Sequence, residues 1–286
     1  MKTRFLISEM LDIPPFEKSW RWQSLCGGCI NDVYRVHTPC ETVVVKVNEQ
    51  HQYPGMFEAE AKGLNLLSSY LSVPKVIQHG ASEGKSYLVL QDLGSGRSEH
   101  DDTESSVSLG RELAHMHKTA VGTVFGLDHN NYIGSLKQNN REHATWPTFF
   151  EQQRLRPLVE QAMSLGRLTS EDARLFEQLY IRLPDLFPEE PPCLVHGDLW
   201  GGNVHGCFFI DPAVYYGCRE MDIAMTLLFG GFSSSFYNAY ESIHPLTKGW
   251  MERVDLCNIY PNLVHLVLFG TGYRSSIRAA LKKYCR

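Results

Sequence analysis

Short apolar runs separated by turn residues occupy the first third of the chain. Residues 21–25, 33–38 and 42–48 are rich in β-branched and aromatic side chains, and residues 75–80 and 86–93 repeat the pattern. Runs of this length and composition, bounded by glycine, proline or polar clusters, are typical of β-strands. The pattern therefore predicts a strand-rich region of five short strands.

One helix is predicted between the third and fourth of these strands, over residues 54–71. Phe57, Ala61 and Leu64 fall on one helical face. Pro54 suits the beginning of such a helix, where a backbone N–H is not needed.

The pattern changes to helical spacing at about residue 105 and keeps it to the end, apart from short strands and loops at 192–213. The fold class predicted is α+β. An N-terminal lobe, 1–92, would hold an antiparallel sheet and one key helix, and a C-terminal lobe, 93–286, would be mainly helical. A hinge is expected near residues 91–94.

Composition excludes several classes of protein. The 286 residues are 43% hydrophobic and 21% charged, as in globular proteins, and the net charge of −5 does not favour a nucleic acid or an anionic membrane as partner. No apolar run approaches the roughly 20 residues of a membrane span, and the charged N-terminal stretch is unlike a signal peptide. We expect a cytoplasmic protein, a monomer or weak dimer. The eight scattered cysteines do not suggest a disulfide framework.

Lys46 interrupts the apolar run VVVKV. A buried ammonium group needs an anionic partner, and Glu60 leans toward the apolar face of the following helix. Glu58 is a competing partner that lies further from that face. Alternatively, the run is an edge strand whose lysine reaches water.

The stretch HGDLWGGN contains the strongest chemical signal. His196, Asp198 and Asn203 have the H-x-D-x-x-x-x-N spacing of a kinase catalytic loop, and Asp211 ends the next apolar run, CFFI. An aspartate at the first acidic position can accept a proton from a substrate hydroxyl. The amide and the second carboxylate can hold Mg²⁺ on a nucleotide. Capping residues on loops are the alternative reading of the same pattern.

Two adjacent glycines, Gly27 and Gly28, lie between the first two predicted strands. Paired glycines allow backbone N–H groups to approach a phosphate, although many such pairs are simple hairpin turns. The segment is not a Walker A motif.

The chain resembles the fructosamine kinase family, in the aminoglycoside and choline kinase branch of the protein-kinase-like fold. The resemblance rests on GGCINDVYRV, VVVKVN, MFEAEAKGL, SYLVLQDL, FGLDHNNYIG, HGDLWGGN, IDPAVYYGCREMDIAM and NLVHLVLFGTGYRSS, which together span nearly the whole chain. It implies a bilobal kinase that uses ATP and Mg²⁺ to phosphorylate a sugar hydroxyl of a fructosamine or ribulosamine. The substrate would be a small or a protein-bound ketoamine.

The resemblance also implies roles for individual residues. Asp198 would be the proton acceptor, and Asp222 would brace the catalytic loop. The remaining positions are Lys46 and Glu60 as the phosphate-orienting pair, Asn203 and Asp211 as metal ligands, and Gln91, Asp92 and Leu93 as a hinge that contacts adenine.

Several alternatives stay open. Trp200 either walls the sugar site or supports the loop from the core. The acidic segment 99–104 either attracts a cationic acceptor or is only solvated. The acceptor could instead be another amino sugar, an amino alcohol or another small metabolite. A nucleotide-binding regulator without catalysis is the alternative of a different class.

Overall fold

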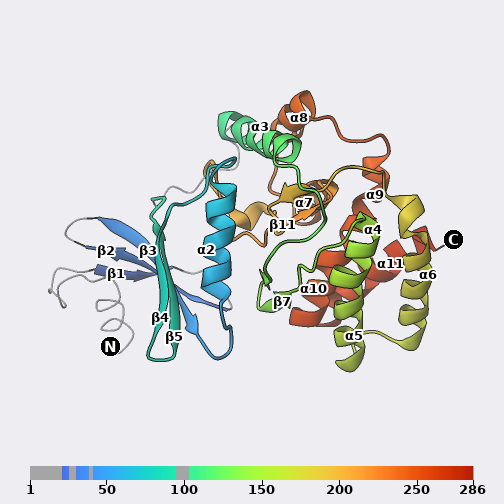
Figure 1. Ribbon diagram of the computed structural model, residues 1–286, viewed down its shortest axis with the longest axis horizontal. Coiled ribbons are helices and arrows are strands. Elements are labelled where there is room, and N and C mark those ends of the chain that lie inside the picture. The colour runs from blue at the N-terminus through green and yellow to red at the C-terminus, as the bar shows by residue number, and fades with distance from the viewer. Residues whose placement is uncertain (1–20, 26–29, 39–40, 95–102, 286) are drawn as a thin grey trace.

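The strand-rich part of the protein is one antiparallel sheet (Figure 1). The computed structural model describes residues 21–25, 30–38, 41–94 and 103–285. The strands follow the order β1-β2-β3-β5-β4. They are β1 (Arg21–Ser24), β2 (Asp32–His37), β3 (Thr42–Glu49), β4 (Val76–Ser82) and β5 (Lys85–Gln91). All five predicted strands are present.

Strand β3 lies in the middle of this sheet and carries Lys46. Lys46 pairs with Val33 on β2 and with Leu88 on β5. The edge-strand alternative for Lys46 is therefore wrong, because both sides of β3 are covered by neighbouring strands. Val44 packs in the same cluster as Phe57 of the following helix, and side chains two residues apart on a strand share a face. Lys46 thus projects toward that helix.

Helix α2 (Met56–Leu67) is the predicted helix of the sheet region and stands between the sheet and the helical part in Figure 1. Phe57, Ala61 and Leu64 are buried against Leu88 and Leu90 of β5, as their spacing predicts. The helix begins two residues after Pro54.

The other face of α2 comes close to the helical part of the protein at Gly63. A Cβ added to Gly63 would lie 3.2 Å from the side chain of Val214. The absence of a side chain at Gly63 thus lets α2 approach the segment that follows Asp211.

The remainder of the chain is mainly helical. Three short antiparallel ladders are inserted in it: β6 (Asn131–Ile133) with β7 (Leu136–Gln138), β8 (Cys193–Val195) with β11 (Tyr215–Gly217), and β9 (Val204–His205) with β10 (Phe208–Phe209). The helices are α3 (Thr103–Thr119), α4 (Trp146–Phe149), α5 (Arg156–Ser164), α6 (Ser170–Leu186), α7 (Glu220–Leu228), α8 (Ser234–Ile243), α9 (Trp250–Cys257), α10 (Ile259–Phe269) and α11 (Arg274–Tyr284), with the short turns η2 (Gly201–Asn203) and η3 (Thr271–Tyr273).

The sequence predicts one helix over residues 146–163, and the structure divides it. A π-helical segment, η1 (Phe150–Leu155), separates α4 from α5. Pro157 has no N–H, so it cannot donate to the carbonyl oxygen of Gln153 in the usual way. The Arg154 Nη1 donates to that oxygen instead, at 3.2 Å. A side chain thus replaces the missing backbone donor where η1 meets α5.

The apolar core follows this division only in part. Two clusters of buried side chains lie in the sheet region, around Val45 and around Phe57. Of the two larger clusters, one lies in the helical part, and the other also includes Leu67 at the end of α2 and Leu71 just after it. The predicted α+β fold class is confirmed, whereas the lobe boundary between residues 92 and 93 stays a proposal. No helix in the described ranges is long and apolar enough to cross a membrane.

Candidate active site

Lys46 lies between two carboxylates that come from distant parts of the chain. Its Nζ is 2.6 Å from Oε1 of Glu60 on α2 and also contacts Oδ1 of Asp211. Burial disfavours the charged ammonium, but Asp211 and Glu60 outweigh this cost and raise the pKa of Lys46 above its usual value. Glu58, the competing partner, pairs with Lys62 on the exposed side of α2, at 2.8 Å. Of the two candidate partners, Glu60 is therefore the one that forms an ion pair with Lys46.

The predicted catalytic loop, residues 196–203, begins directly after β8, and its own histidine holds it in place. The Nδ1 of His196 accepts the Asp198 backbone N–H at 3.3 Å, and its Nε2 donates to the carbonyl oxygen of Ile210 at 3.0 Å. Burial lowers the pKa of His196, so the ring is neutral, with its proton on Nε2. His196 thus joins the loop that carries Asp198 to the strand end that carries Asp211.

Gly197 permits the sharp turn of this loop. Its φ is 82°, and an added Cβ would lie 2.1 Å from the carbonyl oxygen of Ala213. A residue with a side chain would therefore clash with the backbone and strain the turn.

Asp198 and Asn203 are joined by hydrogen bonds. The Nδ2 of Asn203 donates to the backbone oxygen of Asp198 at 2.8 Å and to its Oδ2 at 3.0 Å. Burial and the charges of Asp211 and Asp222 raise the pKa of Asp198 to about 7, although the hydrogen bond from Asn203 acts in the opposite direction. Near neutral pH the carboxyl group of Asp198 is thus poised between accepting and releasing a proton.

The donor set around Asn203 and Asp211 fits Mg²⁺. Because the Asn203 nitrogen is held by Asp198, its amide oxygen is the atom left for a cation. The Ile210 N–H donates to the Asn203 backbone oxygen at 3.0 Å, so the two ligand-bearing segments are adjacent. Within the described ranges no group of three or more His, Cys, Asp or Glu residues could hold a metal alone. Mg²⁺ usually binds one or two protein ligands plus substrate phosphates, and that mode suits this pair.

Asp222 contacts the backbone of this loop, in agreement with the bracing role that the family resemblance implies. Its Oδ2 accepts the backbone N–H of His196 at 2.7 Å, and its Oδ1 accepts that of Gly197 at 2.9 Å. His117 on α3 adds a third contact, at 3.2 Å from Oδ2. Burial alone would raise the pKa of Asp222, but the contact with His117 and the backbone donors lower it. The buried carboxylate is therefore charged and fixes the loop backbone.

The segment after Asp211 is held by amides that the sequence analysis did not single out. The Nδ2 of Asn131 on β6 donates to the carbonyl oxygen of Val214 at 2.8 Å, and the Nε2 of Gln138 on β7 donates to that of Ala213 at 3.0 Å. Asn131 belongs to the motif FGLDHNNYIG, whereas Gln138 lies outside it, and the sequence pattern alone does not show what either amide binds.

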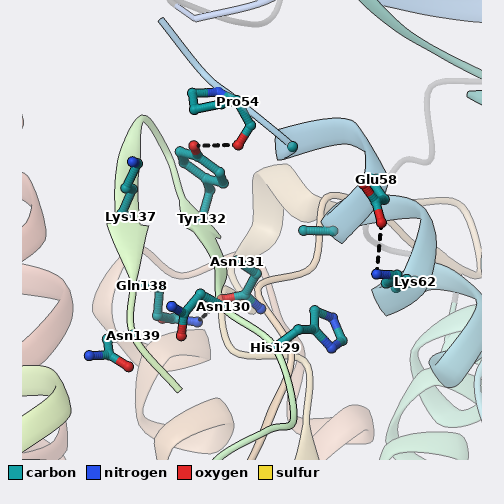
Figure 2. Close-up of a pocket in the computed structure, with 12 residues that line it drawn as sticks. Pro54, Glu58, Lys62, His129, Asn130, Asn131, Tyr132, Lys137, Gln138 and Asn139 are labelled. Atoms are coloured by element: carbon teal, nitrogen blue, oxygen red, sulfur yellow. Dashed lines mark hydrogen bonds and ion pairs between the residues drawn. The ribbon is translucent and has the colours of Figure 1, made fainter. Parts of the chain in front are cut away.

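A separate hollow of about 510 Å³ lies between the beginning of α2 and the β6–β7 hairpin. Figure 2 shows Tyr132 of β6 directed toward Pro54, whose carbonyl oxygen accepts its hydroxyl hydrogen at 3.0 Å. Because Pro54 lies just before α2, this hydrogen bond links the helix that carries Glu60 to the helical part. No pattern in the sequence indicates this contact.

The remaining predicted site residues lie at the edges of this arrangement. Gln91 ends β5, and its N–H donates to the carbonyl oxygen of Lys75 at 2.9 Å, while Asp92 pairs with Arg35 at 2.8 Å. A contact between the backbone of Gln91 and adenine would therefore use the backbone carbonyl oxygen. The hinge assignment of Gln91, Asp92 and Leu93 stays a prediction. Gly27, Gly28 and residues 99–102 lie outside the described residues.

Trp200 follows Asp198 by two residues, and its side chain is 38% exposed. This exposure does not suit a core tryptophan. The ring is available at the surface beside the catalytic loop, so a role toward the acceptor stays as the prediction.

The model of the family described as fructosamine kinase matches residues 9–286. The chain belongs to this family. A probable ketoamine kinase of Synechocystis sp. is 38% identical over 271 residues, covering 92% of this chain and 90% of the relative. The chloroplastic protein-ribulosamine 3-kinase of Arabidopsis thaliana is 35% identical, over 92% and 82% of the two chains. These matches confirm the predicted family and support the predicted ketosamine kinase activity.

Solved structures agree with the fructosamine kinase assignment. The crystal structure of a candidate fructosamine-3-kinase from Thermobifida fusca has a TM-score of 0.83 and 33% identity, over 92% of this chain and 93% of the other. An aminoglycoside phosphotransferase in complex with ADP and hygromycin B has a TM-score of 0.67 at 15% identity, over 99% of both chains. That second likeness shows the kinase-like fold alone.

Proposed function

We propose that this protein transfers the γ-phosphoryl group of Mg–ATP to a sugar hydroxyl of a ketoamine. The observation that carries the proposal is the convergence of Lys46, Glu60, Asp198, Asn203 and Asp211 from β3, α2 and the loops around β9 and β10 into one site. Family membership gives the reaction class, and these contacts support the task that we propose for each residue.

Lys46 contacts the phosphates of the nucleotide, and Glu60 holds the ammonium group of Lys46 in place. Asn203 and Asp211 are the residues that would hold Mg²⁺. When bound, the ion neutralises charge on the phosphates and on the transferred group. The hinge residues Gln91, Asp92 and Leu93 contact adenine through their backbone.

At the acceptor end, Asp198 receives the proton of the attacking hydroxyl. A general base works best when its pKa is near the working pH, and the pKa of about 7 for Asp198 meets that condition. Asn203 orients the carboxylate through Oδ2, and Asp222 fixes the backbone on which Asp198 stands.

The acceptor is a ribulosamine or a fructosamine, either free or on a protein amine. Relatives bear the names ketoamine kinase and protein-ribulosamine 3-kinase, which supports this class of acceptor. A net charge of −5 suits a substrate with a protonated amine. The cytoplasmic location and the monomeric or weakly dimeric state remain predictions.

ATP consumption with a panel of acceptors tests the proposal, with mass spectrometry of the products. The panel holds ribulose-lysine, fructose-lysine, choline, an aminoglycoside and free ribulose. We expect a gain of one phosphoryl group on a ketoamine, and loss of that activity in Asp198→Asn. A preference for choline or the aminoglycoside would overturn the ketoamine part and leave the kinase part standing.

A further inference from the structure

Five rings form a continuous cluster at the surface beside the catalytic loop, here called the aromatic ridge: Trp200, Phe229, His265, Phe269 and Tyr273. Ring centroids are 5.9 Å apart for Trp200 and Phe229 and 4.9 Å for Phe229 and His265. His265 lies 5.4 Å from Phe269 and 5.0 Å from Tyr273. The rings come from the catalytic loop, the end of α7, the end of α10 and η3. The helical spacing of four residues brings His265 and Phe269 together on α10, and tertiary packing adds the rings of Trp200 and Phe229.

Three of these rings are unusually exposed. Trp200 is 38% exposed, Phe229 is 42% exposed and Phe269 is 60% exposed. Scattered exposed apolar side chains are ordinary, but neighbouring ones that form a patch indicate a binding surface. His265 does not add charge to the patch near neutral pH, because burial lowers its pKa, although the hydrogen bond from its Nδ1–H to the carbonyl oxygen of Pro261 at 2.7 Å acts in the opposite direction. The ridge thus presents neutral, apolar rings.

One end of the aromatic ridge is fixed to the catalytic machinery. A Cβ added to Gly202 would lie 2.2 Å from the Trp200 ring, so this ring lies directly over the glycine backbone. Gly201 lies against the Gly230–Gly231 turn, which follows Phe229. Trp200 is therefore held in position two residues from Asp198.

The other end of the ridge lies near the sheet region. Phe269 follows Leu268, and a Cβ added to Gly134 would lie 3.1 Å from the Leu268 side chain and 3.7 Å from that of Ile30. Ile30 lies two residues before β2 and packs against the cluster that contains buried residues of α2. The ridge therefore runs from the proposed base toward the junction of the two parts of the protein.

We propose that the aromatic ridge binds the amine-bearing part of the acceptor and thereby sets which ketoamines are phosphorylated. The proposal rests on the proposed function, because a sugar whose hydroxyl contacts Asp198 must send its amine outward along the surface beside the loop. The indole ring of Trp200 binds the protonated amine, since such a ring attracts an ammonium group placed over its face. Phe229 and Phe269 take the apolar stem that follows the amine, such as the methylenes of a lysine side chain.

The ridge thus selects ketoamines on long or aromatic amines. Phe229 and Phe269 determine this specificity without contacting the reacting atoms.

Two ribulosamines with the same sugar test this inference, one on methylamine and one on 3-phenylpropylamine. In Phe229→Ala and in Phe269→Ala, kcat/KM for the long substrate should fall about tenfold, which corresponds to about 1.4 kcal/mol. For the methylamine substrate it should change less than twofold, and KM for ATP should stay unchanged. Leucine at either position should restore part of the loss, because an apolar side chain remains.

Met251→Ala is the matched control, since Met251 is also 60% exposed but lies on α9. This substitution should change kcat/KM for neither ribulosamine. Equal losses on both ribulosamines in the ridge variants, or no loss on the long one, would overturn the inference and leave the proposed function intact. If the wild-type protein phosphorylates neither these ribulosamines nor the fructosamines of the same two amines, the proposed function fails and the inference fails with it.

Discussion

Replacing Asp198 with asparagine should stop catalysis and, at the same time, stabilise the protein at alkaline pH. Burial and two neighbouring carboxylates raise the pKa of Asp198 from 3.8 to about 7. The folded protein therefore keeps a proton on this carboxyl group at pH values where the unfolded chain has lost it. The stability contributed by this group is present at low pH and is lost as the pH rises toward 7.

The size of the effect follows from the pKa shift. Stability changes by about 1.4 kcal/mol per pH unit for each proton that only the folded state binds. Between pH 5 and pH 8 the wild type should thus lose about 2–3 kcal/mol at this site, mostly below pH 7. Asparagine does not titrate, and its side-chain oxygen can still accept the hydrogen bond from Asn203. Between pH 5 and pH 8, the free energy of unfolding of the variant should therefore rise by that amount relative to the wild type. For a chain of this size, this corresponds to about 5 °C in Tm.

Thermal unfolding of both proteins at pH 5, 6, 7 and 8 measures the difference, in EDTA and without nucleotide. Asp185→Asn, at an exposed position on α6, is the control and should show no such trend. In parallel, kcat of Asp198→Asn should fall by a factor of about 10² to 10⁴, the usual loss of a positioned base. A Tm difference that is the same at every pH would refute the reasoning about the buried carboxylate, and near-normal kcat would refute the assignment of Asp198 as base.

Three further predictions concern the residues around Asp198. Lys46→Met and Glu60→Gln should be strongly non-additive in a double-mutant cycle of kcat/KM for ATP, because they break one shared ion pair; additive losses would contradict the pair. Asp211→Ala should raise the Mg²⁺ concentration needed for half-maximal activity more than Asn203→Ala, since a carboxylate brings full charge and an amide only a dipole; the reverse order in a Mg²⁺ titration would show misassigned ligands. Asp222→Ala should leave two buried N–H groups unsatisfied and lower the free energy of unfolding by about 2–5 kcal/mol in urea denaturation; a cost below about 1 kcal/mol would exclude the bracing role.

Local pattern was sufficient to predict much of the fold. Short runs of β-branched and aromatic residues between turn residues predicted the strands, and the helical repeat of Phe57, Ala61 and Leu64 predicted both α2 and its buried face. The π segment that divides the helix at residues 150–155 was not predicted, because the spacing of apolar residues continues through it. Only the side chain of Arg154, which takes over a backbone oxygen, shows how the π segment is accommodated.

The site was predictable as far as its chemistry depends on spacing within a motif. His196, Asp198 and Asn203 could be placed together from the sequence, and Glu60 could be preferred to Glu58 by its helical face. Contacts between segments that are far apart in the chain could not be predicted from the sequence pattern. The rings of the aromatic ridge are separated by up to 73 positions, and no periodicity joins Trp200 to Tyr273. Such sites are created by tertiary packing and become visible only in three dimensions.

The shared contact of Lys46 with Glu60 and Asp211 has a thermodynamic consequence for ligand binding. A divalent cation at Asp211 and the Lys46 ammonium group compete for one carboxylate and repel each other. Phosphate oxygens that draw Lys46 toward themselves free that carboxylate for the cation. Nucleotide should therefore tighten Mg²⁺ binding, and by linkage Mg²⁺ should tighten nucleotide binding by the same factor. The two ligands are coupled through the position of one lysine.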